Sequence, residues 1–408
     1  MQIIQHSHSI TAPQGFRAAG VHCGLKKEKL DLALIVSDVP ALSAAVYTQN
    51  NVKAAPLHVS RQNLQDGTAR GIIINSGNAN ACAPDGEANA QEMCRLTADA
   101  LGLSPSDITV ASTGVIGQSL TPKMPNIAAG VKLTVTALSS DDVGANNAAK
   151  AIMTTDLTQK DLAVQIEIGG KPVKIGAIAK GSGMIHPNMG TMLCFITTDA
   201  HIAPDALDAA LKQVTAQSFN RISVDGDTST NDFCQILANG LAENPPIEIN
   251  SAEFTIFYDA LLHLCTRLAR AIAADGEGAT HLITCIVNGA STEEDAAQIS
   301  KSVIASSLVK SAVFGKDANW GRILCAAGYS GVQFDADKVD IAFASNAGRV
   351  QVCKQGRGLL FDENLALDVL TPHEIIIEIA LQEGDLSATC WGCDLTYEYV
   401  RINGEYRS

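Results

Sequence analysis

Short runs in which apolar side chains dominate, or alternate with polar ones, recur along the chain. Residues 164–168, Val-Gln-Ile-Glu-Ile, alternate strictly. Because successive side chains of a strand point to opposite faces, this pattern predicts a strand with one covered face. Runs of this kind predict strands at residues 32–36, 71–75, 108–112, 162–168, 173–178, 192–198, 281–288, 339–344 and 375–379.

Longer stretches between these runs carry apolar residues every three or four positions, which is the spacing of one helix face. They predict helices at residues 86–101, 141–153, 206–217, 252–274 and 293–313. This mixture favours an α+β or layered α/β fold over a repeated βαβ barrel. No low-complexity linker or internal repeat separates the elements, so we expect one interlocked body without a flexible hinge.

The composition indicates a folded protein with a large interior, since 46% of the 408 residues are hydrophobic and 18% are charged. A net charge of −14 disfavours nucleic acid and anionic membrane surfaces as partners. The first residues lack the basic and apolar segments of a signal peptide, and no later run is long enough to span a membrane. We therefore expect a cytoplasmic protein.

The cysteines and acidic residues show no clear metal-binding pattern. Most of the eleven cysteines stand singly in apolar runs, which is typical of buried thiols in a reducing compartment. Cys390 and Cys393 form a C-x-x-C pair, but no second pair or histidine motif completes a zinc site. Residues 225–232 alternate carboxylates and hydroxyls without the spacing of a calcium loop, so we expect loop hydrogen bonds and helix caps there.

The most unusual segment is residues 180–193, Lys-Gly-Ser-Gly-Met-Ile-His-Pro-Asn-Met-Gly-Thr-Met-Leu, which leads from a glycine-rich turn into an apolar run. Gly190 has no Cβ to hinder attack on its carbonyl, as an N-to-O acyl shift by Thr191 would require. After cleavage, Thr191 would own a nucleophilic Oγ and an α-amine whose ordinary pKa, about 7.7 to 8.0, suits a general base. On these residues alone, a plain turn before a buried strand is the favoured explanation, because Gly-Thr pairs are common.

The same segment resembles the signature of the ornithine acetyltransferase family, K-G-S-G-M-I-x-P-N-M-[AG]-T-M-L. Further blocks similar to that family follow in the family's order over essentially the whole chain. They are 75–82 (NSGNANAC), 112–117 (STGVIG), 224–232 (VDGDTSTND), 317–322 (DANWGR) and 390–397 (CWGCDLTY). His186 replaces an expected small residue, and Gly190 stands where alanine is commoner, but the nucleophile is in place.

The resemblance implies a glutamate N-acetyltransferase of arginine biosynthesis. Thr191 would take acetyl from N-acetylornithine as an ester, release ornithine and pass the acetyl group to glutamate in a ping-pong scheme. Acetyl-CoA is a possible co-substrate, as in the family's bifunctional members, and no cofactor or metal is implied.

The resemblance also implies a layered sandwich of stacked β-sheets between helices, of the self-cleaving N-terminal-nucleophile type. Cleavage between Gly190 and Thr191 would give an alpha chain of residues 1–190 and a beta chain of residues 191–408. These chains would remain interlocked as one unit and assemble as a heterotetramer with two of each.

Two predicted catalytic features surround this nucleophile. By resemblance, Thr113 and Gly114 form the oxyanion hole, although the sequence alone favours a turn with a side-chain hydrogen bond at these positions. Lys180 is implied to meet the substrate, where its ammonium could pair with an α-carboxylate and favour the unprotonated Thr191 amine. A lone lysine at a strand end is otherwise usually solvated.

The remaining implied substrate contacts are spread over the chain. Glu277, in a turn after a long predicted helix, would meet a substrate amine, and Thr154 is either a contact or a helix-terminal threonine. Asn403 and Ser408 imply that the C-terminus folds back into the active site. His186 is close enough in sequence to assist the first cleavage, but it is also typical of a structural or exposed histidine.

Two alternatives use the same residues differently. A self-cleaving aminopeptidase or amidohydrolase would pass the acyl group from Thr191 to water instead of glutamate. An uncleaved amino-acid-binding regulatory protein would keep the pocket without turnover.

Overall fold

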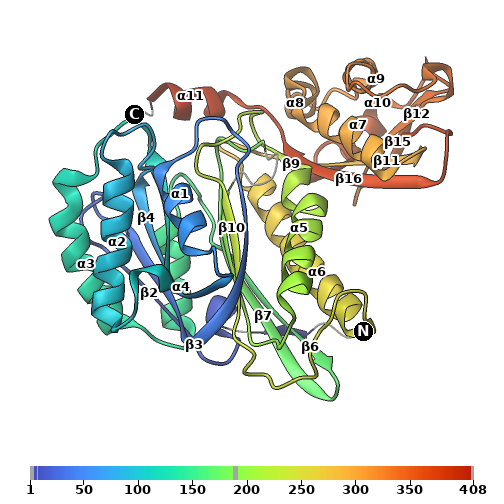
Figure 1. The fold of residues 1–408 in the computed structure, drawn as a ribbon. Coiled ribbons are helices and arrows are strands. Elements are labelled where there is room, and N and C mark those ends of the chain that lie inside the picture. The colour runs from blue at the N-terminus through green and yellow to red at the C-terminus, as the bar shows by residue number, and fades with distance from the viewer. Residues whose placement is uncertain (1–3, 7, 187–191, 406–408) are drawn as a thin grey trace.

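The computed structural model describes residues 4–6, 8–186 and 192–405, which form two β-sheets with helices packed against them (Figure 1). Gly190, Thr191 and Ser408 lie outside the described residues. The helices are α1 (Ala55–Asn63), α2 (Gly86–Leu101), α3 (Met124–Ala137), α4 (Asp142–Ile152), α5 (Pro204–Gln217), α6 (Ala252–Ala274), α7 (Glu293–Ala305), α8 (Ser307–Phe314), α9 (Trp320–Gly328), α10 (Glu363–Val369) and α11 (Tyr397–Glu405).

The larger sheet contains strands from both sides of the proposed cleavage point. They are β1 (Ile4–His6), β2 (Phe16–Val21), β3 (Leu32–Tyr47), β4 (Thr68–Asn78), β5 (Ile108–Val115), β6 (Lys160–Ile168), β7 (Lys171–Lys180), β8 (Leu193–Thr198) and β10 (Phe233–Ala238). Their order is β1-β6-β7-β8-β10-β3-β4-β5, and β2 pairs with β3. The parallel pair β8 and β10 therefore lies between β7 and β3, each of which it meets in antiparallel pairing.

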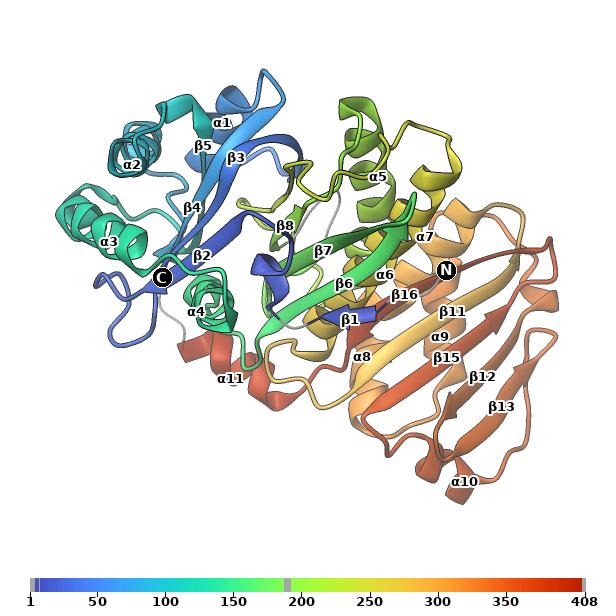
Figure 2. The ribbon, with the colours of Figure 1, turned by 90° about the horizontal axis from the view of Figure 1, so that it is seen from below.

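The smaller sheet lies beside the larger one and is built from the later part of the chain (Figure 2). Its order is β14-β13-β12-β15-β11-β16-β9. The strands are β9 (Ile222–Ser223), β11 (Leu282–Ala290), β12 (Asp340–Ser345), β13 (Gly348–Lys354), β14 (Arg357–Gly358), β15 (Glu374–Ala380) and β16 (Leu386–Cys393). Helix α7 packs on β11 and β16, and its Ile299 and Val303 share a core with Ile283 and Ile377.

Helices cover both faces of the larger sheet because its strands are apolar on both sides. Ile196 and Ile236 face α5 and α6, where they meet Leu261 and Leu264. The opposite face packs on α4, while α2 and α3 cover the part formed by β3, β4 and β5. This layering confirms the predicted mixed α/β class. No helix in the described ranges combines the length and apolar character needed to cross a membrane.

All the predicted strands are present, and α2 and α6 match their predicted limits residue for residue. The predicted helix at 293–313 is wrong in one respect, because the structure divides it into α7 and α8. Ser306 between them adopts an extended conformation and its hydroxyl accepts a hydrogen bond from the Val309 N–H, so it starts a second helix. The sequence patterns did not predict β1, β2, β9, β10, β13, β14, β16, α1, α3 and α9 to α11.

A buried ion cluster joins three parts of the chain. The Lys160 ammonium, at the start of β6, donates to Asp156 Oδ1 at 2.8 Å and to Asp275 Oδ2 at 2.6 Å. Asp156 Oδ1 also accepts a hydrogen bond from the Gly181 N–H, 2.7 Å away, and Asp275 Oδ2 accepts one from the Leu157 N–H, 3.0 Å away. The Lys160 and Asp156 side chains are inaccessible to solvent. The cluster therefore fixes the α4–β6 loop, the end of β7 and the end of α6 against one another.

We predict that Lys160→Met destabilises the fold by about 3 to 5 kcal/mol, because it leaves two buried carboxylates without their shared cation. Burial opposes the ionisation of Asp156, but the Lys180 and Lys160 ammonium groups hold the pKa of its carboxyl well below its usual range. The Asp156 contribution is therefore present at neutral pH and is lost as pH falls. Urea unfolding at neutral and acidic pH should show the variant's deficit shrinking in acid. Lys171→Met, at an exposed position on β7, is the matched control, and an equal effect of both variants would contradict the prediction.

Candidate active site

Six of the predicted site residues line one pocket of about 160 Å³. They come from the end of β5, the loop after α4, the end of β7, the turn after α6 and the C-terminal helix α11. These residues are Thr113, Gly114, Thr154, Lys180, Glu277 and Asn403. Met192, which follows the predicted nucleophile in sequence, lines an adjoining cavity of about 20 Å³ together with Thr113 and Lys180.

Lys180 is a buried lysine at this pocket, and not a solvated lysine at a strand end. Its side chain lies in the interior, and Nζ donates to Thr113 Oγ1 at 3.1 Å. Burial lowers the pKa of Lys180, and the Lys160 ammonium acts in the same direction, while the carboxylates of Asp156, Asp232 and Glu277 oppose the shift. An anionic ligand in the pocket would therefore gain a partner that has already lost its hydration.

The turn at Thr113 and Gly114 depends on a close approach of two backbones. Gly114 has φ = +131°, and a Cβ there would lie 2.4 Å from the carbonyl carbon of Gly77, so only glycine fits. The pairing register of β4 and β5 shifts at this point. Thr113 Oγ1 accepts a hydrogen bond from Lys180 Nζ. Among the described residues nothing accepts the hydrogen of the Thr113 hydroxyl, so this hydrogen is available to a ligand.

Glu277 and Asn403 meet at the other side of the pocket. Asn403 Nδ2 donates to Glu277 Oε2 at 2.8 Å, so α11 brings the C-terminal part of the chain back to the pocket. A Cβ on Gly183 would lie 2.5 Å from the Glu277 carboxylate, which shows how closely the glycine-rich turn passes this side chain. The Glu277 N–H donates to the Ser182 carbonyl at 3.0 Å and fixes the two segments together.

Thr154 follows the end of α4, whose C-cap is Met153. Its backbone N–H donates to Asp156 Oδ2 at 2.9 Å, so the buried ion cluster also holds this side of the pocket. Asp156, Lys160 and Asp275 were not identified from the sequence, although Asp156 and Lys160 have the spacing of an i, i+4 pair. Asp275 is distant from both in sequence, and only the fold brings its carboxylate to Lys160.

The loop at 225–232 forms part of the pocket wall through hydrogen bonds. Asp225 accepts hydrogen bonds from the backbone N–H groups of Met184 and Ile185, at 2.6 and 2.9 Å. Asn231, which lines the pocket, donates to the carbonyls of Ala79 and Ser112. The predicted loop hydrogen bonds are therefore present, but none of these side chains caps a helix in the described part of the chain. The described residues contain no group of three or more His, Cys, Asp or Glu side chains placed to hold a metal.

His186 and the C-x-x-C pair do not line this pocket. His186 Nδ1 lies 3.0 Å from Ser223 Oγ, and burial, aided by the Lys301 charge, lowers its pKa to about 4. Its ring is therefore neutral near pH 7. Cys390 and Cys393 are free, buried thiols in β16, and burial raises the pKa of both.

Comparison with known proteins gives matches over nearly the full length of the chain. The model of the ArgJ family matches residues 17–408. The arginine biosynthesis bifunctional protein ArgJ of Symbiobacterium thermophilum is 51% identical, over 98% of each chain. The protein of that name from Bacillus subtilis is 46% identical, over 100% of this chain and 98% of its own.

A crystal structure of the arginine biosynthesis bifunctional protein ArgJ from Bacillus halodurans is similar in fold, with a TM-score of 0.50 and 45% identity. The match covers 52% of this chain and 98% of that one. Family model and relatives agree over nearly the whole length, so the chain belongs to the ArgJ family and is an acetyltransferase of arginine biosynthesis.

Proposed function

We propose that the pocket transfers an acetyl group from N-acetylornithine to glutamate through an acetyl ester of Thr191. The observation that carries this proposal is the placement of the buried Lys180 ammonium and the Glu277 carboxylate on one small pocket. Both amino acids carry a carboxylate that could pair with Lys180. Glu277 is available to a substrate amine, and a pocket of about 160 Å³ suits ligands of this size better than large ones.

The proposed first half-reaction forms the ester. The free Thr191 amine removes the proton of its own Oγ, which attacks the acetyl carbonyl of N-acetylornithine. The Thr113 hydroxyl and the Gly114 N–H stabilise the tetrahedral oxyanion. The C–N bond then breaks, and the amine of ornithine leaves with the proton held by the Thr191 amine.

The proposed second half-reaction reverses these roles. The neutral amine of glutamate attacks the ester carbonyl, and the same oxyanion groups stabilise the intermediate. The attacking amine gives its proton to the Thr191 amine, which passes it to Oγ as the C–O bond breaks and N-acetylglutamate is released. The positive charge of Lys180 favours the unprotonated Thr191 amine in both halves. No metal or cofactor is needed, and acetyl-CoA is a second possible donor.

The proposed nucleophile requires a cut between Gly190 and Thr191, which gives an alpha chain of residues 1–190 and a beta chain of residues 191–408. The Bacillus halodurans chain supports this division, because that chain matches over 98% of its own length but over only 52% of the present chain. Residues 191–408 make up 218 of 408 residues, a similar share. We further propose a cytoplasmic heterotetramer with two of each chain and with Ser408 close to the substrate.

The first test of this function is a single half-reaction. With N-acetylornithine and no glutamate, the fragment that begins at Thr191 should gain one acetyl group, and ornithine should appear in a burst. Intact-mass analysis and quenched-flow measurement of ornithine would detect both. Glutamate added afterwards should discharge the ester as N-acetylglutamate. Rapid discharge by water without glutamate would instead favour the amidohydrolase, and an uncut, unacetylated chain would exclude the mechanism.

A second test concerns the oxyanion hole. Thr113→Ala should lower kcat by roughly 10²- to 10³-fold, which is the usual effect of removing one oxyanion donor, with little change in KM. Thr113→Ser keeps the hydroxyl and should retain most of the activity. Steady-state kinetics on fully processed protein would measure both variants. If alanine and serine at this position were equally active, Thr113 would be a structural turn residue.

A further inference from the structure

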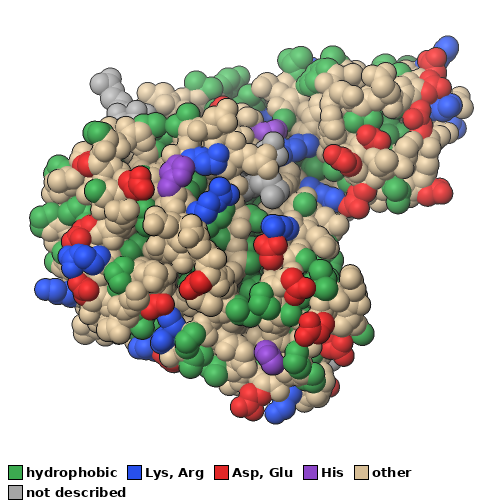
Figure 3. All heavy atoms as spheres, in the orientation of Figure 1, with side chains coloured by type: hydrophobic (Ala, Val, Ile, Leu, Met, Phe, Trp, Pro, Cys, Tyr) green, Lys and Arg blue, Asp and Glu red, His purple; other side chains and the backbone are tan. Residues whose placement is uncertain are grey.

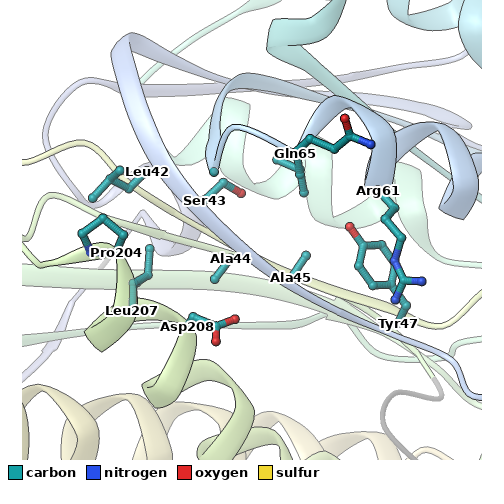
Figure 4. A pocket seen from close by; sticks show the side chains of 12 residues that line it. Leu42, Ser43, Ala44, Ala45, Tyr47, Arg61, Gln65, Pro204, Leu207 and Asp208 are labelled. Atoms are coloured by element: carbon teal, nitrogen blue, oxygen red, sulfur yellow. The ribbon is translucent and has the colours of Figure 1, made fainter. Parts of the chain in front are cut away.

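A second hollow lies outside the catalytic pocket, between α1 and α5 and along the end of β3. It consists of two cavities of about 330 and 420 Å³ that share Ala45, Tyr47 and Arg61. We call this continuous hollow the basic groove. Figure 4 shows Arg61 lying over the ring of Tyr47, and Asp208 projecting from the opposite wall. Small side chains on β3, among them Ala44 and Ala45, leave its floor open.

The charge of the groove is opposite to that of the whole chain. The cavity of about 420 Å³ is lined by Lys53, Arg61 and Lys212 and by no carboxylate among the described residues. Lys212 pairs with Asp208 at 2.7 Å, but neither Lys53 nor Arg61 forms an ion pair within the described part of the chain. Figure 3 shows several Lys and Arg side chains gathered on this face. In a chain of net charge −14, this concentration of cations indicates an anionic ligand.

Arg61 is positioned for such a ligand before one arrives. Its guanidinium carbon lies 5.0 Å from the centroid of the Tyr47 ring, and this stacking holds the planar group while leaving its edge to donate hydrogen bonds. Burial raises the pKa of Tyr47 to about 12, so the ring stays neutral at physiological pH and adds no opposing charge. A guanidinium edge of this kind suits the paired oxygens of a phosphate.

One wall of the groove is hydrogen-bonded to the loop that lines the catalytic pocket. Thr48, in the groove, donates from Oγ1 to the Ser229 carbonyl at 2.9 Å and from its N–H to the Asp232 carbonyl at 3.0 Å. Ser229 lines the catalytic pocket. The strand register places Tyr47 opposite Phe233, and Phe233 opposite Leu193. The groove therefore lies two strand spacings, about 10 Å, from the start of β8.

The size of the catalytic pocket indicates what the groove could bind. A pocket of about 160 Å³ accepts an amino acid, but the nucleotide and phosphates of acetyl-CoA are far larger and must lie elsewhere. We propose that the basic groove binds the phosphorylated nucleotide of acetyl-CoA, with Arg61 and Lys53 on its phosphates. This proposal rests on the proposed function, in which acetyl-CoA is the second donor. On this proposal the flexible arm of acetyl-CoA runs over the loop at residues 229–232, to which Thr48 is hydrogen-bonded, to reach the pocket.

The chemistry that this placement serves differs from the first half-reaction only in its leaving group. Thr191 Oγ attacks the thioester carbonyl, the C–S bond breaks and the C–O bond of the acetyl ester forms. Coenzyme A leaves as a thiol with the proton that Oγ gave up. Glutamate then takes the acetyl group as before.

The test measures kcat/KM for acetyl-CoA and for N-acetylornithine in the processed double variant that carries Arg61→Gln and Lys53→Gln. The value of kcat/KM for acetyl-CoA should fall roughly 10- to 100-fold, the usual effect of losing charged hydrogen bonds. The value for N-acetylornithine should stay within about twofold, since neither residue lines the catalytic pocket. Lys171→Gln, an exposed lysine outside the groove, is the matched control and should change neither value.

A competition experiment identifies the part of acetyl-CoA that is recognised. Adenosine 3′,5′-bisphosphate should inhibit competitively against acetyl-CoA and leave the reaction with N-acetylornithine unchanged. Equal inhibition by inorganic pyrophosphate would overturn the nucleotide assignment, because phosphate alone would explain it. Equal losses with both donors in the double variant, or no turnover with acetyl-CoA while N-acetylornithine reacts, would also overturn the proposal. Absence of turnover with N-acetylornithine would refute the proposed function itself.

Discussion

The Lys160 ammonium between the carboxylates of Asp156 and Asp275 is the interaction on which the geometry of the pocket depends. A buried charge is stable only when its partners satisfy it, so the two carboxylates and the ammonium must keep their positions together. Asp156 also holds the backbone at Thr154 and Gly181. One cluster therefore sets the spacing of the loop after α4, the end of β7 and the end of α6, and each of these segments supplies a residue to the pocket.

The same cluster acts on the pKa of Lys180 in both directions, because Asp156 raises it and the Lys160 ammonium lowers it. Lys180 is buried, and burial by itself disfavours its ammonium. Asp156 and Glu277 oppose that cost, and Asp156 is held in its ionised form by the cluster. Of these two carboxylates, Glu277 lines the pocket, whereas Asp156 acts on Lys180 without lining it. The charged groups around Lys180 are in place before a ligand carboxylate binds, so binding requires little rearrangement of these groups.

Local patterns were sufficient to predict elements whose period is strict, such as α2, α6 and the alternating strand at 164–168. They were insufficient at Ser306, where one hydroxyl starts a new helix inside an apolar pattern. The Lys160 cluster was missed because Asp275, one of its carboxylates, is distant in sequence from Asp156 and Lys160. The six pocket residues were predicted from the resemblance to a family, whereas the contacts that orient them depend on the three-dimensional fold. Gly114 illustrates this difference, since the sequence shows a glycine but not the Gly77 carbonyl that excludes a side chain.

The strand order of the larger sheet has a consequence for the lifetime of the folded protein. Strands β8 and β10 lie between β7 and β3, so the proposed cut between Gly190 and Thr191 would leave two fragments that contribute strands to one sheet. Global unfolding would then separate two molecules, and refolding would become a bimolecular reaction between fragments with incomplete sheets. The lifetime of such a protein is set by the rate of unfolding, and therefore by the unfolding barrier, more than by an equilibrium between folded and unfolded chains. If the proposed cut occurs, each molecule would complete its folding only once.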